Sequence, residues 1–112
     1  MAARPGVLSP TLFVQQVNTV SALTGGRISI NIVTGHTPQE LGYYGDFLNH
    51  DERYERTDEF LTVCRALWSR NGEVNFSGKY YKIESGRLNT PFVSPDRRAP
   101  EIFLGGNSEL AE

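Results

Sequence analysis

The sequence predicts an α/β fold with parallel strands, and its 112 residues form a segment of such a fold. Helical and strand patterns alternate in the order helix, strand, helix, hairpin, strand and helix start, which is typical of a parallel sheet or barrel. The chain supplies two full parallel strands and the end of another at Met1 to Arg4, whereas a closed eight-stranded barrel needs about 250 residues. We therefore expect one partial domain over residues 1–112, with unpaired strand edges and low stability in isolation.

The first helix is predicted between Pro10 and the Gly25-Gly26 pair. Ser9 before Pro10 is typical of a helix cap followed by the first helical residue. Apolar residues then recur at helical spacing, and they are Leu12, Phe13, Val17, Val20 and Leu23.

A strand is predicted from Arg27 to Val33, because its residues alternate in character. Ile28, Ile30 and Ile32 share one face, and Asn31 lies on the other. Residues 35–48 contain three glycines and a proline. This stretch is too irregular for a regular element and long enough to suggest a functional loop.

The second long helix is predicted from Asn49 to Ser69. Asn49 can cap the helix, and Glu52, three residues later, completes a capping box. The buried stripe is predicted to consist of Phe60, Leu61, Cys64, Leu67 and Trp68. The charged residues of the first turns are expected to form a solvated helix face, and they are Asp51, Glu52, Arg53, Glu55 and Arg56.

The remaining elements are a small hairpin, an extended connection and a short strand. The hairpin is predicted as an insertion at about residues 73–84, with Ser77-Gly78 as its turn and its second strand starting at Lys79. Three prolines make residues 86–100 an extended connection. Residues 101–104 form an apolar strand, and Asn107-Ser108 opens a third helix.

Composition excludes several classes of protein. The chain is 38% hydrophobic and 21% charged, which argues against disorder. A net charge of −2 without a Lys/Arg stripe argues against nucleic acid as a partner. No apolar run reaches the ~20 residues of a membrane helix, and the N-terminus lacks a signal peptide, so we expect a cytoplasmic protein. Cys64 is the only cysteine, which excludes an internal disulfide; no metal site is predicted.

Candidate ligand sites follow from the topology, because parallel α/β folds bind ligands at the carboxyl ends of their strands. The loop from Thr34 to His50 and the segment Gly105 to Ser108 occupy such ends. His50 and Tyr54 are four residues apart on one helix face, beside the N–H groups of a helix start, which suits a phosphate. The structural alternatives are a solvent-facing histidine, a packing tyrosine and an ordinary strand-to-helix turn.

Three short sequence motifs, in this order and spacing, resemble motifs of the bacterial-luciferase-like flavin monooxygenases. These motifs are Asn31-Ile32-Val33-Thr34-Gly35, His50-Asp51-Glu52-Arg53-Tyr54 and Phe103-Leu104-Gly105-Gly106-Asn107-Ser108. Within that superfamily, the alkanesulfonate monooxygenases are similar in Arg4-Pro5-Gly6, in Ser9-Pro10-Thr11 and in Phe76-x-Gly78-Lys79. The resemblance covers essentially the whole chain.

The resemblance implies a TIM (β/α)8 barrel, of which this chain is a part with an inserted hairpin. It implies a full-length homo-oligomer that uses reduced FMN (FMNH2) from a separate NAD(P)H-dependent flavin reductase. With O2, such an enzyme converts alkanesulfonates to an aldehyde and sulfite. The flavin carries the chemistry, and the protein binds and orients it and excludes water.

The resemblance also assigns residues to the cofactor. It places His50 and Tyr54 on the flavin and Gly106, Asn107 and Ser108 at its phosphate. Related enzymes often have serine where this chain has Asn107, whose amide can still donate. Finally, it places Asn31 and Thr34 near the isoalloxazine ring and Arg4 close to the site. For Asn31 a hydrogen bond within the barrel is the alternative, and for Thr34 it is a cap at the strand end.

No catalytic residue is predicted within the chain, because the family's catalytic cysteine lies upstream of this segment and its catalytic histidine and arginine lie downstream. Cys64, in the apolar stripe of a helix, is expected to act as a small hydrophobe. We therefore expect the isolated segment to be inactive. Two alternatives remain open: another luciferase-like oxidoreductase, using a deazaflavin or acting on another sulfur compound or an amine, and an inactive truncated fragment.

Overall fold

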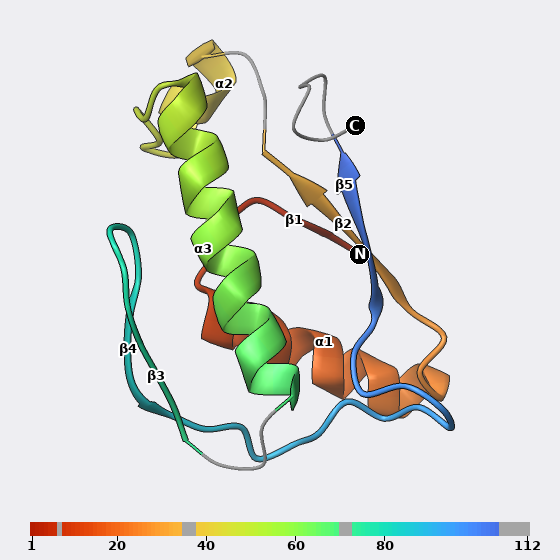
Figure 1. Ribbon diagram of the computed structural model, residues 1–112. Coiled ribbons are helices and arrows are strands. Elements are labelled where there is room, and N and C mark those ends of the chain that lie inside the picture. Colours follow the sequence, from red (N-terminus) through yellow and green to blue (C-terminus); the bar gives the residue numbers. More distant parts are fainter. Residues whose placement is uncertain (7, 35–37, 70–72, 106–112) are drawn as a thin grey trace.

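The computed structural model describes residues 1–6, 8–34, 38–69 and 73–105 (Figure 1). Its elements in chain order are β1 (Ala2–Ala3), α1 (Pro10–Thr24), β2 (Ser29–Val33), α2 (Pro38–Tyr43), α3 (His50–Ser69), β3 (Val74–Ser77), β4 (Lys82–Gly86) and β5 (Glu101–Gly105). The predicted alternation of helices and strands is confirmed, with α2 as an added element. The predicted helix start at Asn107-Ser108 lies outside the described residues.

The main sheet has the strand order β1-β2-β5, and both pairings are parallel. Asn31 of β2 is in register with Ala2 on one side and with Phe103 on the other, and Val33 is in register with Gly105. A separate antiparallel pair is formed by β3 and β4. The parallel α/β class is therefore confirmed, with the hairpin outside the main sheet.

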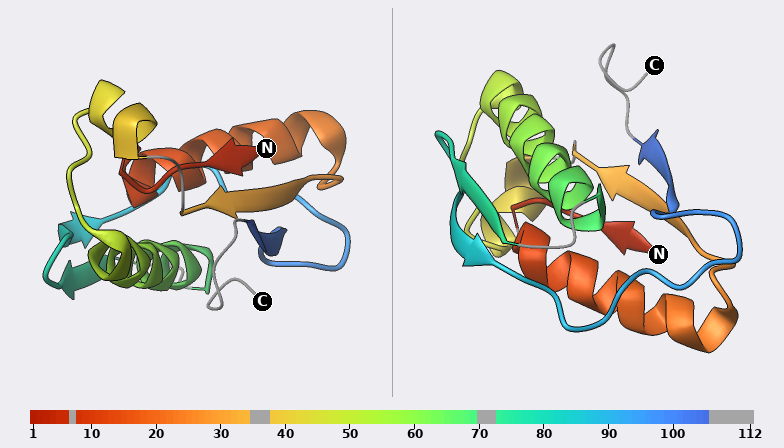
Figure 2. Two further views of the ribbon diagram at one scale, coloured as in Figure 1. Left: turned by 90° about the horizontal axis from the view of Figure 1, so that it is seen from above. Right: turned by 60° about the horizontal axis from the view of Figure 1, so that its bottom comes forward.

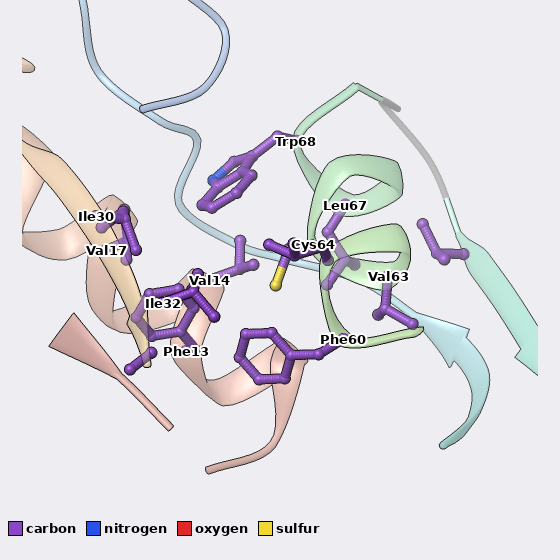
Figure 3. Close-up of a cluster of buried hydrophobic side chains, with 13 residues drawn as sticks. Phe13, Val14, Val17, Ile30, Ile32, Phe60, Val63, Cys64, Leu67 and Trp68 are labelled. Carbon is purple, nitrogen blue, oxygen red and sulfur yellow. The ribbon is translucent and has the colours of Figure 1, made fainter. Parts of the chain in front are cut away.

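The core lies between one face of this sheet and the helices α1 and α3 (Figure 3). Ile30 and Ile32 are fully buried, as their alternation predicted, and the rings of Phe13 on α1 and Phe60 on α3 lie 5.6 Å apart. All five residues of the predicted α3 stripe are buried, and they are Phe60, Leu61, Cys64, Leu67 and Trp68. Burial of these side chains is the main force that holds the two helices on the sheet.

The buried face of α1 differs from the predicted one. Leu12 and Leu23 are 45% and 82% exposed, whereas Val14 is fully buried. The helix instead turns Asn18 and Ser21 inward. Asn18 donates to the carbonyl of Thr90 at 2.7 Å, and Ser21 Oγ accepts from the N–H of Val93 at 2.8 Å. These bonds to a distant segment, together with core packing, set the orientation of α1.

Both long helices have the predicted caps. Ser9 Oγ accepts from the N–H of Leu12 at 3.2 Å, and Gly25 ends α1 with a left-handed φ of 68°. At α3, Asn49 Oδ1 accepts from the N–H of Glu52 at 2.9 Å, and Glu52 Oε1 accepts from the N–H of Asn49 at 3.1 Å. The capping box is therefore confirmed on both of its bonds.

Two local predictions are wrong. The stretch predicted to be irregular contains α2. This helix has only six residues, which are too few for a helical period to be recognised in the sequence. The second hairpin strand starts at Lys82, not at Lys79, and the hairpin ends at Gly86. The reason is Glu59, whose carboxylate accepts the N–H groups of residues 79–81 at 3.0 to 3.3 Å and removes them from strand pairing.

Among the described residues, no helix is both long and apolar enough to cross a membrane.

Candidate functional site

The carboxyl ends of the three parallel strands gather at one end of the sheet, and α3 begins at that same end (Figure 1). Arg4 follows β1, Thr34 follows β2, and Gly105 ends β5 beside Val33. The convergence expected from topology is therefore confirmed for Thr34 and Gly105, and Arg4 joins them at this end. Gly106, Asn107 and Ser108, which continue from β5, lie outside the described residues.

A very small pocket lies at this end, between the strand ends and α3. Its lining includes Arg4, Thr34, Tyr44 and Thr57. The cavity measures about 10 Å³, which is room for about one water molecule. A flavin ring cannot enter it, so any cofactor contact at this end must be made on the outer surface of the strand ends and the helix start.

Asn31 and Thr34, both predicted near the flavin ring, lie on opposite faces of the sheet. Thr34 is two residues after the buried Ile32 and therefore lies on the same face of the sheet. Its hydroxyl lies 3.0 Å from that of Thr57 on α3. Asn31 is exposed on the face away from α1 and α3, in register with Phe103. Thr34 thus joins β2 to α3, and only Asn31 faces the open side of the sheet.

His50 and Tyr54 contact each other, as their spacing predicted. Their ring centroids are 4.8 Å apart, and His50 Nδ1 lies 3.2 Å from a carboxylate oxygen of Asp51. The His50 side chain is 60% exposed, and Tyr54 is half-buried. Tyr54 precedes Thr57 by three residues, or about 4.5 Å along the helix. Since Thr57 contacts Thr34, the His50–Tyr54 pair lies within about two turns of the end of β2.

The start of α3 offers donors, but its charge is mixed. The capping box uses the N–H groups of Asn49 and Glu52 and leaves those of His50 and Asp51 for other acceptors. The carboxylates of Asp51 and Glu52 lie in the same turn and weaken its attraction for an anion. A phosphate here would therefore depend on the side chains of His50 and Tyr54 more than on the helix end alone.

Arg4 brings a positive charge to the same end of the sheet. Its guanidinium lies 5.5 Å from the ring centroid of Tyr44, an arrangement that favours a cation–π contact. This contact ties the residue after β1 to the segment that leads into α3.

Sequence reasoning missed a buried ion pair beneath this end. Arg56 donates to both carboxylate oxygens of Asp46, at 3.1 and 2.6 Å, and the two side chains are 13% and 4% exposed. Burial by itself raises the pKa of Asp46, but the hydrogen bond and positive charge of Arg56 outweigh it and leave the pKa below its usual value. Arg53 is also buried and donates to the carbonyl of Leu48 at 2.8 Å.

The predicted solvated face of α3 is therefore wrong at Arg53 and Arg56. Their spacing relative to Thr57 and Phe60 was the available signal, because positions 53, 56, 57 and 60 share one helix face. A buried arginine needs an acceptor, and Asp46 and the carbonyl of Leu48 supply it.

Comparison with known proteins gives the family. The model of the luciferase-like monooxygenases matches residues 1–111. The fold is similar to a long-chain alkane monooxygenase (TM-score 0.83, 31% identity, 98% of this chain and 30% of that one). It is also similar to an EDTA monooxygenase from Chelativorans sp. BNC1 (TM-score 0.79, 30% identity, 98% and 30%).

A third similar structure is a riboflavin lyase that holds a modified FMN and riboflavin (TM-score 0.81, 25% identity, 99% of this chain and 29% of that one). The chain thus spans about 30% of the length of each of these enzymes. The segment matches part of a TIM-barrel enzyme, and the described residues do not form a closed barrel. On the match to nearly its whole length, the chain belongs to the luciferase-like monooxygenase family, whose members are enzymes.

Proposed function

We propose that this chain forms part of the cofactor site of an FMNH2-dependent monooxygenase that oxygenates alkanesulfonates to an aldehyde and sulfite. The observation that carries the proposal is the His50–Tyr54 ring contact at the start of α3, beside the carboxyl ends of the parallel strands. Ligands of barrel enzymes bind at this end. The modified FMN present in the similar riboflavin lyase supports a flavin as the cofactor.

The residues present fit the phosphate end of FMN. His50 and Tyr54 would hold it with side-chain donors, together with Gly106, Asn107 and Ser108, whose assignment rests on sequence alone. Arg4 and Asn31 would lie toward the flavin ring, whereas Thr34 would act through its bond to Thr57. When bound, the reduced flavin supplies the activation of O2, with electrons from a separate NAD(P)H-dependent flavin reductase.

The chain's own contribution is binding, orientation and the exclusion of water. The Thr34–Thr57 bond fixes α3 against the end of β2, and the buried Asp46–Arg56 pair fixes it against the segment that precedes it, so that the His50–Tyr54 pair is held in place before a ligand arrives. Preorganised donors of this kind bind without the cost of ordering them. We propose that the enzyme is cytoplasmic and homo-oligomeric, and that the isolated segment lacks activity.

A flavin titration tests the cofactor role, using the protein produced from its natural gene. Replacing His50, Tyr54 and Ser108 together by Ala should weaken FMN binding about 100-fold, because charge-assisted phosphate contacts are lost. Tyr54→Phe alone should weaken it less. Tyr80→Phe is a matched control, because it deletes a tyrosine hydroxyl in the hairpin turn that donates to Glu55 of α3. Unchanged FMN affinity in the triple variant would reject the assignment.

The substrate is tested by sulfite release from a linear alkanesulfonate, in the presence of FMN, NADH, a flavin reductase and O2. The resemblance of Arg4-Pro5-Gly6 and Phe76-x-Gly78-Lys79 to alkanesulfonate enzymes supports this substrate. The similarity to alkane and EDTA monooxygenases favours assaying those compounds in parallel. If an alkane or EDTA is oxidised and no sulfite is released from the alkanesulfonate, the proposed substrate is wrong. If a deazaflavin binds more tightly than FMN, the proposed cofactor is wrong.

A further inference from the structure

A hollow of about 530 Å³ lies at the opposite end of the sheet from the candidate site. Its walls come from α1, from the last turn of α3 and from residues 87–98, which lead into the start of β5. Figure 2 shows this connecting segment, in light blue, running alongside α1. We propose that this arginine hollow, rimmed by Arg87, Arg97 and Arg98 and floored by Trp68 and Phe92, binds a small organic anion with an apolar body.

The floor of the arginine hollow is built from side chains that already satisfy one another. The indole N–H of Trp68 donates to Asn18 Oδ1 at 2.8 Å, and Asn18 Nδ2 donates to the carbonyl of Thr90 at 2.7 Å. Trp68 also packs with the core cluster (Figure 3). The floor therefore has a fixed shape, and Trp68, Leu67 and Phe92 supply its apolar part, whereas the lining is polar elsewhere.

The rim, by contrast, carries an excess of positive charge. Arg87 has one exposed ion pair, with Glu73 at 3.7 Å. Arg97 and Arg98 have neither an ion pair nor a hydrogen bond to any residue that the structure describes, and the neighbouring Asp96 is bonded to Ser94 Oγ. Guanidinium groups bind phosphate and sulfonate oxygens through paired N–H donors and also stack on flat rings. An anion would thus give Arg97 and Arg98 the acceptor that the described residues do not supply.

The size of the hollow selects among anions. Its volume falls in the range of sites for organic ligands and far exceeds that of an inorganic ion. An apolar floor beneath a cationic rim is complementary to a molecule that has a flat or apolar body and one anionic group. Aryl phosphates and aryl sulfonates share this chemistry. The inference does not depend on the proposed monooxygenase function, because no residue of the hollow belongs to that site.

Trp68, the only tryptophan in this sequence, lines the hollow and provides a readout, namely the part of the fluorescence change that a Trp68→Phe variant loses. The protein from its natural gene is titrated with phenyl phosphate, benzenesulfonate, inorganic phosphate and benzyl alcohol, and intrinsic fluorescence is recorded. We expect a saturable change with at least one of the two aryl anions, about tenfold weaker binding of inorganic phosphate and no saturation with benzyl alcohol. The aryl anion that binds with the higher affinity shows whether the hollow prefers a phosphate or a sulfonate group. A Trp68→Phe variant confirms the origin of the signal.

The variant Arg97→Ala/Arg98→Ala should weaken binding of the aryl anion by about tenfold or more, because two charge-assisted contacts are lost. The control Arg65→Ala/Lys82→Ala removes two positive charges elsewhere and should leave the affinity unchanged. Three results would overturn the proposal: no saturable binding of either aryl anion, undiminished binding by the Arg97/Arg98 variant, or equal weakening by the control. FMN affinity should be the same in all of these variants, which separates this site from the proposed cofactor site.

Discussion

Asp46→Asn tests whether the buried ion pair beneath the strand ends stabilises this part of the protein. The substitution keeps the size of the side chain and removes its charge. Two opposite charges at about 4 Å and an effective dielectric constant of about 20 attract each other by about 4 kcal/mol. Removing one partner of a buried pair typically costs about 3–5 kcal/mol. Arg56 retains 13% exposure and can recover some hydration, so we expect a loss of about 3 kcal/mol in the free energy of unfolding.

The assay is urea denaturation of the wild type, Asp46→Asn, Arg56→Met and the double variant. The double variant should lose less than the sum of the two single losses, because an apolar side chain no longer leaves a charge unpaired. Lys82→Ala, which breaks an exposed pair with Glu84 at 3.1 Å, is the control and should change stability little. A loss below about 1 kcal/mol for Asp46→Asn, or additive losses in the double variant, would refute this account.

The same pair predicts a pH dependence. The pKa of Asp46 is lowered in the folded state. Its contribution to the free energy of unfolding is therefore complete above the pKa of about 3.9 that it has in the unfolded state, and is lost as pH falls through the folded-state pKa. The stability difference between wild type and Asp46→Asn should therefore be constant near neutral pH and shrink below about pH 4. A difference that shrinks between pH 6 and pH 8 would point to another group.

Three further outcomes are expected. Glu59→Ala should raise amide hydrogen exchange at residues 79–81 and cost about 2 kcal/mol, because the carboxylate accepts three backbone N–H groups there; protected amides in the variant would contradict this. Asn49→Ala should cost about 1 kcal/mol in urea denaturation, since it removes the cap of α3, and Asn49→Asp should restore most of that loss. Cys64 should resist alkylation at pH 8 until the protein unfolds, because burial raises its thiol pKa to about 12; rapid labelling of the folded protein would show that it is accessible.

Features with local causes could be predicted from the sequence. The caps at Ser9 and Asn49 depend on residues within one turn, and the buried isoleucines of β2 depend on strict alternation. Both were predicted correctly. The contact between His50 and Tyr54 also follows from helical spacing alone.

Features whose partners are distant in the chain could not be predicted in the same way. The inward face of α1 depends on Asn18, whose acceptor Thr90 is 72 residues away. The start of the second hairpin strand depends on Glu59, a residue of another element. Asn31 and Thr34 were both predicted near the flavin ring, and nothing in the sequence indicates that the Thr34 hydroxyl contacts that of Thr57, 23 residues away.

The ion pair also limits which residues evolution can place at position 6. A Cβ added to Gly6 would lie 2.5 Å from Asp46 Oδ2 and 2.6 Å from Arg56 Nη2, and neither atom can move away without weakening the pair. Relatives that retain an aspartate and an arginine at positions 46 and 56 should therefore retain glycine at position 6. Relatives with a larger residue there should have lost at least one of the two charges. Sequence variation at three positions that are far apart in the chain is thus expected to be correlated through a single contact.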